Sequence, residues 1–481
     1  MRIPITLFYL LCSIATASTQ SSIQDKINQT AQAANLQQGQ LGVMLMEVQS
    51  GKVLASYNAD KSLIPASTIK AITTASALKL LGASYQFKTE LQYDGAIENG
   101  VLKGNLYIKG YGDPTLGSEE MEEAIGMEAL LEICLQATQK AGIRAVEGAV
   151  VGDASYFKGN VAGRNWQWAD LGNYYASGIW GLNLHENLYR LSFEQTSRLG
   201  ATPKVAKIEP KIPSISFINE LKSAGRNTGD NAYIYGGPYA DTRFIRGTIP
   251  VGSGLFTIKG SIPNPPLFAA HQLRRKLIAS GIHVEQDANT NLKINPKRSR
   301  QIIYTHYSPE LLEIAKRANF RSVNLYCEAM IRAIGAKANA DDSLEGGIEA
   351  IENYWASEGV DMRGFFLQDG SGLSARNGAT PNQFACILQQ ISRDQSLFDV
   401  FYNTLPVGGQ SGTLKSLFRN TAVVGKIRAK SGSISRVRAY TGYAKNKKGQ
   451  LLAFAVIANN YTGSSRTVRK QLETLMIQFC E

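Results

Sequence analysis

The chain has 481 residues, of which 44% are hydrophobic, 19% are charged and 9% are aromatic. This length is enough for about two to four domains, and the hydrophobic share excludes an intrinsically disordered chain. No apolar run reaches the roughly 18 residues that a membrane-spanning helix needs. Lys and Arg number 51 against 39 Asp and Glu, a formal charge of +12. These cations are scattered, so the charge does not identify a partner.

The N-terminus has the pattern of a secretory signal peptide, residues 1–17. Arg2 supplies a positive start, residues 3–14 are mostly apolar, and Ala15-Thr16-Ala17 supplies the small residues that signal peptidase requires. The apolar stretch is too short to span a bilayer, although a short N-terminal anchor is an alternative. We therefore expect export, a periplasmic or cell-wall-associated mature protein, and peripheral or no membrane contact.

Four cysteines remain in the mature chain, and export permits disulfides. The sequence contains no Cys-x-x-Cys pair, and it does not choose among the three pairings that four thiols allow. Cys134 and Cys327 lie in apolar stretches of helical character, so we expect both to be buried. The pairing stays open for all four: Cys134, Cys327, Cys386 and Cys480.

The start of the mature chain predicts a β-hairpin followed by a helix. Residues 41–59 alternate in polarity around a turn at Gln49-Ser50-Gly51. An amphipathic helix follows over about residues 66–81, and Gly82 is its predicted C-terminal stop.

The pattern changes between about residues 85 and 298 to short strands and Gly-rich turns. Residues 130–151 and 271–286 each run a helix into Gly-Ile and then into a short strand. A β-rich stretch, residues 188–266, lies between these two similar units. We therefore expect an inserted domain from residues 85–187 plus 267–298, with a β-rich domain of residues 188–266 nested inside it.

From residue 309 the sequence predicts helices, then a Gly-rich loop at residues 369–378, then three strands and a closing helix over about residues 464–479. Together with the N-terminal hairpin, this order predicts an antiparallel sheet flanked by helices. The fold class is therefore α+β, with residues 18–84 plus 299–481 in one domain.

The sequence excludes several common kinds of active site. None of its four His residues has the spacing of a zinc site. It also lacks Gly-x-Ser-x-Gly, the Walker A pattern and Gly-x-Gly-x-x-Gly. We expect no cofactor and no metal. A nucleophilic serine in this chain must then be activated by a group other than His.

Lysine can activate a serine when burial or a nearby positive charge keeps its amine uncharged. Ser-x-x-Lys on a helix places both side chains on one face. Ser67 follows Pro65 at a helix start, where free N–H groups and the helix dipole favour an oxyanion. We therefore choose the first of the three occurrences, which are Ser67/Lys70, Ser76/Lys79 and Ser155/Lys158.

Two further motifs follow in order along the chain. Ser322-Val323-Asn324 opens a helix, and Lys430-Ser431-Gly432 lies on a predicted strand before the last hairpin. With Ser67 and Lys70, this ordered set resembles the active-site motifs of the penicillin-recognising serine enzymes.

Within that superfamily the sequence resembles the class C low-molecular-mass penicillin-binding proteins, which are D-alanyl-D-alanine carboxypeptidases and endopeptidases. The likeness covers essentially the whole mature chain. Val323 in the second motif and Ser431 in the third differ from the residues that many relatives have at these positions. In this family a transpeptidase/β-lactamase-like catalytic domain is interrupted by two nested domains after its first motif. Four more segments carry the likeness, at residues 112–116, 166–170, 369–373 and 405–409.

The resemblance implies an acyl-enzyme mechanism. Ser67 would attack the terminal D-Ala-D-Ala carbonyl, and Lys70, held neutral by burial and by Lys430, would take its proton. Ser322 would relay the proton to the leaving amine, and Asn324 would orient Lys70 and the substrate amide. Water would then release the acyl-enzyme, and a cross-linked peptide as substrate would make the enzyme an endopeptidase.

The resemblance also implies how the substrate is held. Lys430 and Ser431, next to Gly432, would bind the terminal carboxylate, and the backbone N–H groups of Ser67 and Ser433 would hold the oxyanion. Asp170 would receive a free side-chain amine of the stem peptide in a pocket lined by Tyr175, although Asp170 is alternatively a structural residue of a turn.

Implied partners are peptidoglycan stem peptides and β-lactam antibiotics as covalent inhibitors, with no nucleic acid. The oligomeric state stays open.

Two alternatives keep the same motifs. A serine β-lactamase needs a deacylation base, but no Glu-x-x-Leu-Asn occurs between Ser322 and Lys430. A penicillin-binding sensor or wall-binding protein would be acylated without efficient turnover. The intact motifs argue against this second alternative, and a hydrolysis assay separates it from an enzyme.

Overall fold

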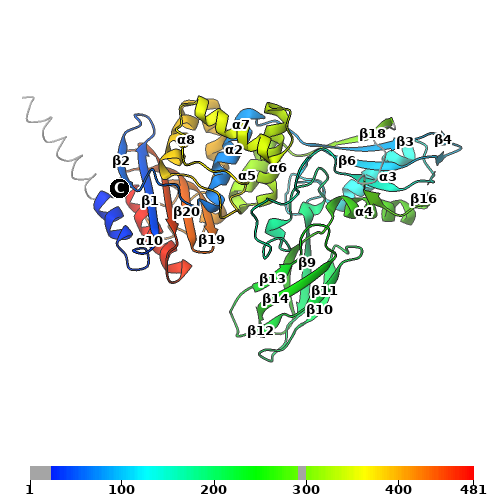
Figure 1. The fold of residues 1–481 in the computed structure, drawn as a ribbon, viewed down its shortest axis with the longest axis horizontal. Coiled ribbons are helices and arrows are strands. Elements are labelled where there is room, and N and C mark those ends of the chain that lie inside the picture. Colours follow the sequence, from blue (N-terminus) through cyan, green and yellow to red (C-terminus); the bar gives the residue numbers. More distant parts are fainter. Residues whose placement is uncertain (1–22, 291–298) are drawn as a thin grey trace, which may run out of the picture. The chain divides into compact units, whose positions relative to one another are not determined.

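The structure is a computed structural model that describes residues 23–290 and 299–481 (Figure 1). The predicted signal peptide lies outside the described residues. The chain divides into two compact units. Unit 1 comprises Met1–Ala83, Ala315–Val323 and Ile348–Glu481, and unit 2 comprises Ser84–Ile314 and Asn324–Gly347. Among the described helices, none combines the length and the apolar character that crossing a membrane requires.

Unit 1 contains a five-stranded antiparallel sheet in the order β19-β20-β21-β1-β2. The predicted N-terminal hairpin and the three predicted C-terminal strands form this one sheet. It is joined where β1 pairs with β21, from Gln40 opposite Asn459 to Glu47 opposite Leu452. The strands are β1 (Gln40–Glu47), β2 (Val53–Tyr57), β19 (Ile427–Ile434), β20 (Val437–Lys445) and β21 (Leu451–Asn459).

Helices cover both faces of this sheet because β1 is apolar on both of its sides. Val43 and Leu45 belong to a core cluster with residues of α10 (Ser465–Gln478). The alternate side chains Met44 and Met46 pack against Ala385 of α8 (Pro381–Arg393). Figure 1 shows α8 and α10 on opposite sides of the strands. The α+β expectation of an antiparallel sheet flanked by helices is confirmed.

A helix at residues 23–31 shares its core cluster with α10, and the helix that carries the first motif packs against α8. The predicted helix at residues 66–81 is present as a short 3-10 turn, η1 (Ala66–Thr68), that continues into α2 (Ile69–Leu80). Gly82 follows with φ of 97°, as expected of a C-terminal stop. The others are α9 (Gln395–Thr404) and η5 (Gly412–Leu414), while α5 (Leu311–Arg321) and α7 (Leu344–Ser357) continue into unit 2.

Unit 2 is rich in strands. Its strands are β3 (Lys88–Asp94), β4 (Ile97–Glu98), β5 (Val101–Leu102), β6 (Leu106–Gly110), β7 (Ala145–Val146), β8 (Val150–Asp153), β9 (Leu188–Glu194), β10 (Lys204–Glu209), β11 (Ser216–Asn219), β12 (Lys222–Ala224), β13 (Asn231–Tyr235), β14 (Thr242–Pro250), β15 (Leu255–Ser261), β16 (His283–Val284), β17 (Asn289–Thr290) and β18 (Arg300–Tyr307). Its helical elements are α3 (Met127–Lys140), η2 (Tyr174–Ala176), η3 (His185–Asn187), α4 (Pro265–Ala279) and α6 (Asn324–Ala338).

The two helix-strand units that the sequence predicts at residues 130–151 and 271–286 lie side by side. α3 leads into β7 and α4 leads into β16, and these two strands pair in parallel. They belong to the sheet β16-β7-β5-β4. Unit 2 also contains a larger sheet, in the order β17-β8-β6-β3-β18. Cys134 on α3 and Cys327 on α6 are 6% and 0% exposed, so their predicted burial is confirmed.

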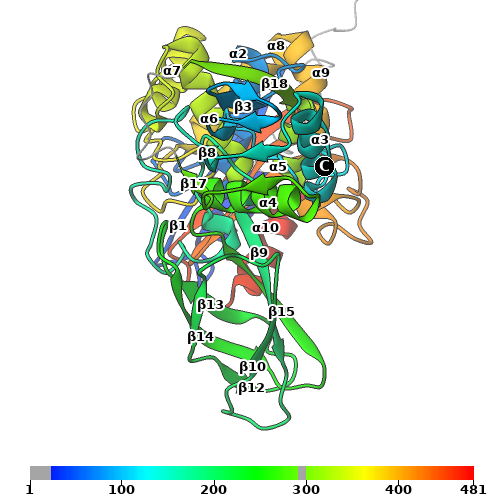
Figure 2. The same ribbon diagram turned by 90° about the vertical axis from the view of Figure 1, so that its right-hand side faces the viewer.

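Strands β9 to β15 form two further sheets, β10-β9-β15 and β11-β14-β12, with β13 beside β14 (Figure 2). Side chains of both sheets, including Leu191, Phe193 and Ile245, belong to one core cluster with side chains of α3 and α4. Apolar packing is therefore continuous through unit 2.

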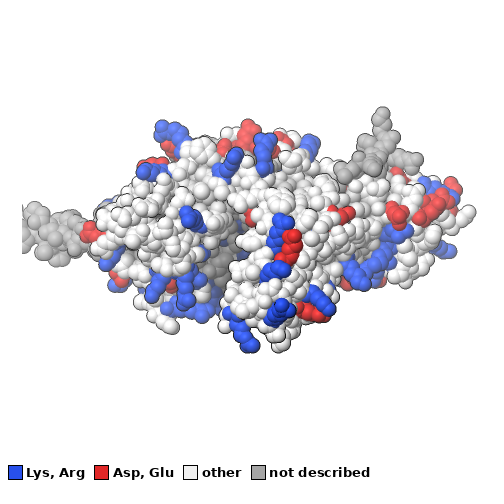
Figure 3. Space-filling model, turned by 60° about the horizontal axis from the view of Figure 1, so that its bottom comes forward, with Lys and Arg blue, Asp and Glu red and all other residues white. Residues whose placement is uncertain are grey.

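Figure 3 shows Lys and Arg side chains over one face of the molecule with Asp and Glu among them, in keeping with a scattered charge.

Asp113 carries an unusual buried carboxyl group. It is 1% exposed, and its Oδ1 accepts hydrogen bonds from the backbone N–H (2.8 Å) and the hydroxyl (2.7 Å) of Thr115. Its Oδ2 has no hydrogen-bond partner among the described residues. Burial raises the pKa of Asp113 to about 6, against the lowering effect of the bonds from Thr115.

This pKa predicts that Asp113 destabilises the fold as the pH rises. Between the usual value of 3.8 and about 6, the folded protein keeps a proton that the unfolded chain releases, so the free energy of unfolding falls. The fall attributable to Asp113 is on the order of 3 kcal/mol. We expect Asp113→Asn to gain stability relative to the wild type as the pH rises from 4 to 7, measured by urea unfolding.

The matched control for this experiment is Asp361→Asn. Asp361 is exposed, and its hydrogen bonds with Arg363 hold its pKa at about 2, below the range tested. The stability difference between this control and the wild type should change far less than that of Asp113→Asn from pH 4 to 7, because most of the titration of Asp361 lies below pH 4. A difference for Asp113→Asn that changes equally little with pH would contradict the prediction.

Candidate active site

Ser67 and Lys70 lie together at the start of the helix after Pro65. The chain turns sharply at Ala66, where φ is 48°, and Ser67 is the middle residue of η1. One turn later on α2, Lys70 places its Nζ 3.0 Å from the Oγ of Ser67. The side chain of Lys70 is completely buried. Burial disfavours the charged form of an amine, so this environment suits a lysine that takes a proton from a hydroxyl.

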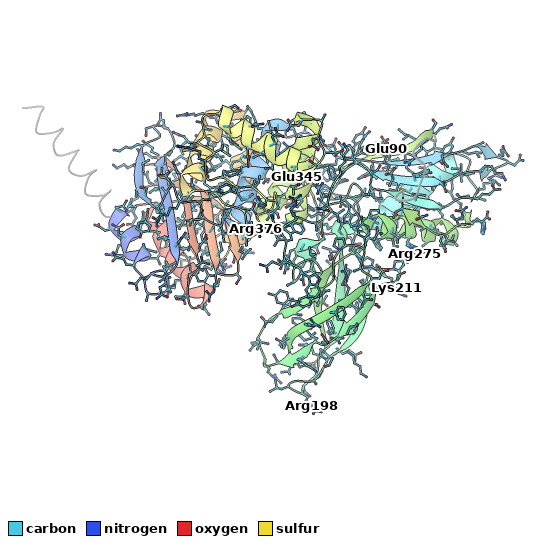
Figure 4. All side chains as sticks on the ribbon, viewed as in Figure 1. Glu90, Arg198, Lys211, Arg275, Glu345 and Arg376 are labelled. Atoms are coloured by element: carbon cyan, nitrogen blue, oxygen red, sulfur yellow. The ribbon has the colours of Figure 1, made fainter. Side chains whose placement is uncertain are left out.

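The Gly-rich loop at residues 369–378 supplies another partner of Lys70. Lys70 Nζ donates to the carbonyl oxygen of Ser371 at 2.5 Å, and the hydroxyl of Thr73 donates to the carbonyl of Gly370 at 2.7 Å. The amine of Lys70 therefore lies between the Ser67 hydroxyl and a backbone carbonyl. Arg376, labelled in Figure 4, follows in the same loop and is exposed.

The buried carboxylate of Asp369 holds this loop in shape. It accepts hydrogen bonds from the backbone N–H groups of Gly372 and Ser374, both at 2.6 Å, and from Asn377 Nδ2 at 2.9 Å. Gly372 has φ of 77°, and a Cβ at this residue would lie 2.0 Å from the carbonyl oxygen of Ala66 and 3.0 Å from the nitrogen of Ser67. Only glycine allows this approach to the backbone of η1.

The second and third motifs contribute Ser322 and Lys430. Ser322 occupies the link between α5 and α6 with φ of 59°. Lys430 on β19 is completely buried, and its Nζ donates to Ser322 Oγ at 3.0 Å and to the carbonyl of Ser431 at 2.6 Å. The hydroxyl of Ser431 donates to Thr413 Oγ1 at 2.8 Å. Each lysine of the site thus donates to a serine hydroxyl and to a backbone carbonyl.

Gly432 lets β19 approach the helix start. A Cβ at Gly432 would lie 2.7 Å from the carbonyl oxygen of Pro65, and 3.0 and 3.1 Å from the backbone nitrogens of Thr68 and Ser67. Ser433, the next residue, is exposed on β19. The strand backbone and the N–H end of η1 are therefore close neighbours, an arrangement in which two backbone N–H groups can face one oxyanion.

Within unit 2, hydrogen bonds join Asp170, Tyr175 and Asn324. Tyr175 on η2 donates its hydroxyl to Asp170 Oδ1 at 2.9 Å, and Asn324 Nδ2 donates to the carbonyl of Tyr175 at 2.7 Å. Burial raises the pKa of Asp170, although the bond from Tyr175 lowers it, and burial together with Asp170 raises the pKa of Tyr175. Asp170 is therefore held in a defined orientation.

The start of α6 is also fixed by a buried pair. Tyr326 donates its hydroxyl to the carboxylate of Glu186 at 2.6 Å, and Ser118 donates to the same oxygen at 2.7 Å. Glu186 lies in η3, where φ is positive for His185, Glu186 and Asn187 in succession. Non-glycine residues adopt this conformation at a cost in energy, so the surrounding contacts must impose it.

The other two Ser-x-x-Lys pairs are arranged differently. Ser76 is buried in the middle of α2, where its hydroxyl donates to the carbonyl of Ile72 and accepts from Trp355 Nε1. Lys79 forms an ion pair with Asp394 at 2.6 Å. Lys158, with its side chain 71% exposed, lies 3.6 Å from the carboxylate of Asp342. Of the three pairs, Ser67 and Lys70 have the geometry expected of a nucleophile and its base.

Sequence reasoning did not identify several groups that contact the motif residues. These are the carbonyl of Ser371, Gly372, and Thr413 on η5, and Thr73 likewise contacts the loop beside the site. The sequence marks residues 369–373 only as part of a Gly-rich loop and of a family likeness. A backbone carbonyl carries no signal in the sequence, and nothing near Thr413 marks it as a partner of Ser431. In the described residues, no group of three His, Cys, Asp or Glu side chains is arranged to hold a metal ion.

The contact at Gly372 yields a prediction. Gly372→Ala would force the loop away from η1 and shift the carbonyl of Ser371 from Lys70. Since misplacement by about 1 Å can cost a factor on the order of 100, we expect acylation of Ser67 by a fluorescent penicillin to slow by at least about tenfold. The control is Gly359→Ala, because Gly359 has φ of 83° but nothing within 4 Å of its added Cβ. Equal slowing in both variants would mean that backbone strain, and not the contact with η1, explains the effect.

Comparison with known proteins gives consistent matches over nearly the whole chain. A D-alanyl-D-alanine carboxypeptidase from Actinomadura sp. (strain R39) is 26% identical over 80% of this chain and 71% of its own length. D-alanyl-D-alanine carboxypeptidase DacB from Haemophilus influenzae is 26% identical over 82% of this chain and 80% of its own length.

Among solved structures, penicillin binding protein 4 (dacB) from Haemophilus influenzae shares the fold, with a TM-score of 0.79 and 24% identity over 96% of this chain and 97% of that one. The family described as D-Ala-D-Ala carboxypeptidase 3 (S13) matches residues 23–479. The chain therefore belongs to the D-Ala-D-Ala carboxypeptidase 3 (S13) family.

Proposed function

We propose that this protein is a serine DD-peptidase that removes the terminal D-Ala from peptidoglycan stem peptides and cleaves D-Ala cross-links through an acyl-enzyme on Ser67. The observation that carries this proposal is the hydrogen bond from the buried amine of Lys70 to Ser67 Oγ. Membership of the S13 family and the names of its relatives as D-alanyl-D-alanine carboxypeptidases support it.

The first step forms the acyl-enzyme. Ser67 Oγ attacks the carbonyl carbon of the penultimate D-Ala, and Lys70 accepts the hydroxyl proton. In its uncharged form, Lys70 can donate one N–H to the carbonyl of Ser371 while its lone pair faces Ser67. The loop carbonyl thus orients the amine for proton transfer, which is why its position matters to the rate.

The negative charge of the tetrahedral intermediate needs two backbone donors. We assign this role to the N–H groups of Ser67 and Ser433, which flank the close approach of Gly432 to η1. A donor of this kind contributes about 2.7–4 kcal/mol to transition-state stabilisation in a comparable enzyme.

The leaving group is D-Ala or the cross-linked peptide, and its amine must gain a proton as the C–N bond breaks. We assign the relay to Ser322, whose hydroxyl is hydrogen-bonded to Lys430. Lys430 and Ser431 bind the terminal carboxylate of the substrate, and Asn324 orients its amide. A water molecule then attacks the ester, Ser67 leaves, and the shortened peptide is released.

Specificity for the stem peptide is assigned to Asp170. A carboxylate facing an ammonium group is a strong, directional contact, and Tyr175 fixes the orientation of Asp170. The substrate class that fits is a stem peptide whose third residue carries a free side-chain amine, such as diaminopimelate or lysine.

The proposal also covers the location of the enzyme, its inhibition by β-lactams and its domain organisation. The pattern of residues 1–17 supports export to the periplasm or cell wall, where the substrate lies. β-Lactams are expected to acylate Ser67, and a relative, penicillin binding protein 4 from Haemophilus influenzae, has been solved in complex with a β-lactam. We further propose that residues 188–266, with their own two sheets, are a domain nested inside residues 85–187 plus 267–298.

The nucleophile is tested by labelling the purified mature protein with a fluorescent penicillin. Wild type should be labelled covalently, and Ser67→Ala should not, because the acyl bond has no oxygen to form on. Ser155→Ala, which alters an exposed serine of another Ser-x-x-Lys pair, is the control and should label like wild type. Release of D-Ala from a pentapeptide distinguishes an enzyme from a sensor that is acylated without turnover. Label on Ser67→Ala would show that a different serine is the nucleophile.

The role of Asp170 is tested with two pentapeptides that differ only in acetylation of the side-chain amine at the third residue. Wild type should hydrolyse the free-amine peptide with a kcat/KM at least about tenfold higher, since one partly buried charge pair is worth roughly 1.5–3 kcal/mol. Asp170→Asn should remove this preference while leaving penicillin labelling intact. Asp287→Asn, at a carboxylate that is 93% exposed, should keep it. A preference that survives in Asp170→Asn would assign the residue a purely structural role.

A further inference from the structure

Unit 2 contains a pocket of about 240 Å³ that none of the proposed catalytic or substrate-binding residues lines. Its walls come from the loop after β8, at residues 154–161, from residues 179–181, from the start of α4, and from Tyr239 and Arg332. All of these segments belong to unit 2. The pocket is therefore a property of this unit alone.

One side of the pocket is aromatic. The rings of Trp180 and Tyr239 meet edge to face, with centroids 5.0 Å apart and planes at 74°. Trp180 is 4% exposed, whereas Tyr239 is 54% exposed and lies at the surface. Phe157 lies near the guanidinium of Arg332, at 5.7 Å from ring centroid to charge. Such rings offer flat apolar faces to a ligand at little cost in side-chain entropy.

The buried side of the pocket holds unused hydrogen-bond donors. Arg332 is 4% exposed and donates from its two terminal nitrogens to the carbonyls of Lys158 and Asn160, the former at 2.7 Å. Its Nε, and the indole Nε1 of Trp180, have no hydrogen-bond partner among the described residues. A buried donor without an acceptor is costly, so these two groups favour a ligand that brings oxygen acceptors.

The charges around the pocket do not require an anion. Lys158 and Arg332 line it, and none of the lining residues is Asp or Glu. The carboxylates of Glu328, Glu345 and Asp342 nevertheless act on Arg332 from outside the pocket. The ligand that fits is therefore neutral or weakly charged, with apolar faces for the aromatic rings and oxygen atoms at its edge.

We propose that this pocket binds an amino-sugar ring of the peptidoglycan glycan, an inference that rests on the proposed function for the choice of polymer. The C–H faces of a pyranose pack on aromatic rings, while its hydroxyl and acetamide oxygens accept hydrogen bonds. In this pocket the aromatic rings can pack against the sugar face, and the buried N–H groups can donate to the sugar oxygens. The glycan strand would then be held by residues other than those proposed to process the peptide.

The test measures binding of a peptide-free disaccharide of N-acetylglucosamine and N-acetylmuramic acid to the mature protein by calorimetry. Arg332 is left unchanged because it supports the loop at Lys158 and Asn160. Tyr239→Ala removes the exposed aromatic face, and Ser155→Trp fills the pocket from a residue that is itself exposed. Tyr307→Ala is the matched control, since Tyr307 is 57% exposed in the same unit and does not line the pocket.

We expect wild type and Tyr307→Ala to bind the disaccharide equally, and Tyr239→Ala and Ser155→Trp to bind at least about tenfold more weakly. All four proteins should still be labelled by penicillin, which verifies folding. Ser67→Ala should bind the disaccharide like wild type. Disaccharide binding therefore tests the glycan site, while penicillin labelling and D-Ala release test the DD-peptidase proposal independently. The proposal would be overturned if wild type that is labelled by penicillin did not bind the disaccharide, or if Tyr239→Ala and Ser155→Trp bound it as tightly as wild type does. It would also be overturned if wild type bound maltose as tightly as the disaccharide.

Discussion

The catalytic proposal depends on one buried amine. Lys70 is completely enclosed, with Ser67 Oγ at 3.0 Å and the carbonyl of Ser371 at 2.5 Å. A lysine in water is charged and cannot act as a base, whereas burial removes the hydration that favours its charged form. The packing of α2, η1 and the loop at residues 369–378 therefore makes the chemistry available, and each of these segments must be held in place to keep it.

Sheet pairing brings these segments together. β1 pairs along its whole length with β21, so the two ends of the chain close one sheet around a core of apolar side chains. β19 at the edge of that sheet carries Lys430 and approaches η1 through Gly432. A shift of one residue in this register would turn Lys430 to the opposite face and separate it from Ser322. Apolar burial in the sheet thus fixes the polar contacts of the site.

Unit 2 presents its polar groups by a different means. Asn324 holds the carbonyl of Tyr175, Tyr175 holds Asp170, and Tyr326 is bonded to Glu186 in a turn of left-handed residues. These contacts are buried or half-buried hydrogen bonds, which are costly to leave unmade and so define one geometry. The pocket beside Arg332 is an exception within this unit, because two of its buried donors lack acceptors, and that exception is the basis for a glycan site.

The sequence alone determined the local elements and the order of the motifs. Periodicity predicted the hairpin at residues 41–59, the helix that ends before Gly82, the closing helix and the burial of Cys134, because apolar spacing is itself the cause of these structures. The tertiary structure decided the rest, including the acceptor role of the Ser371 carbonyl, the contact of Ser431 with Thr413, and the raised pKa of Asp113. A carbonyl is chemically the same at every residue, and the pKa of a carboxyl depends on what surrounds it. Only packing between segments that are distant in the chain sets either one.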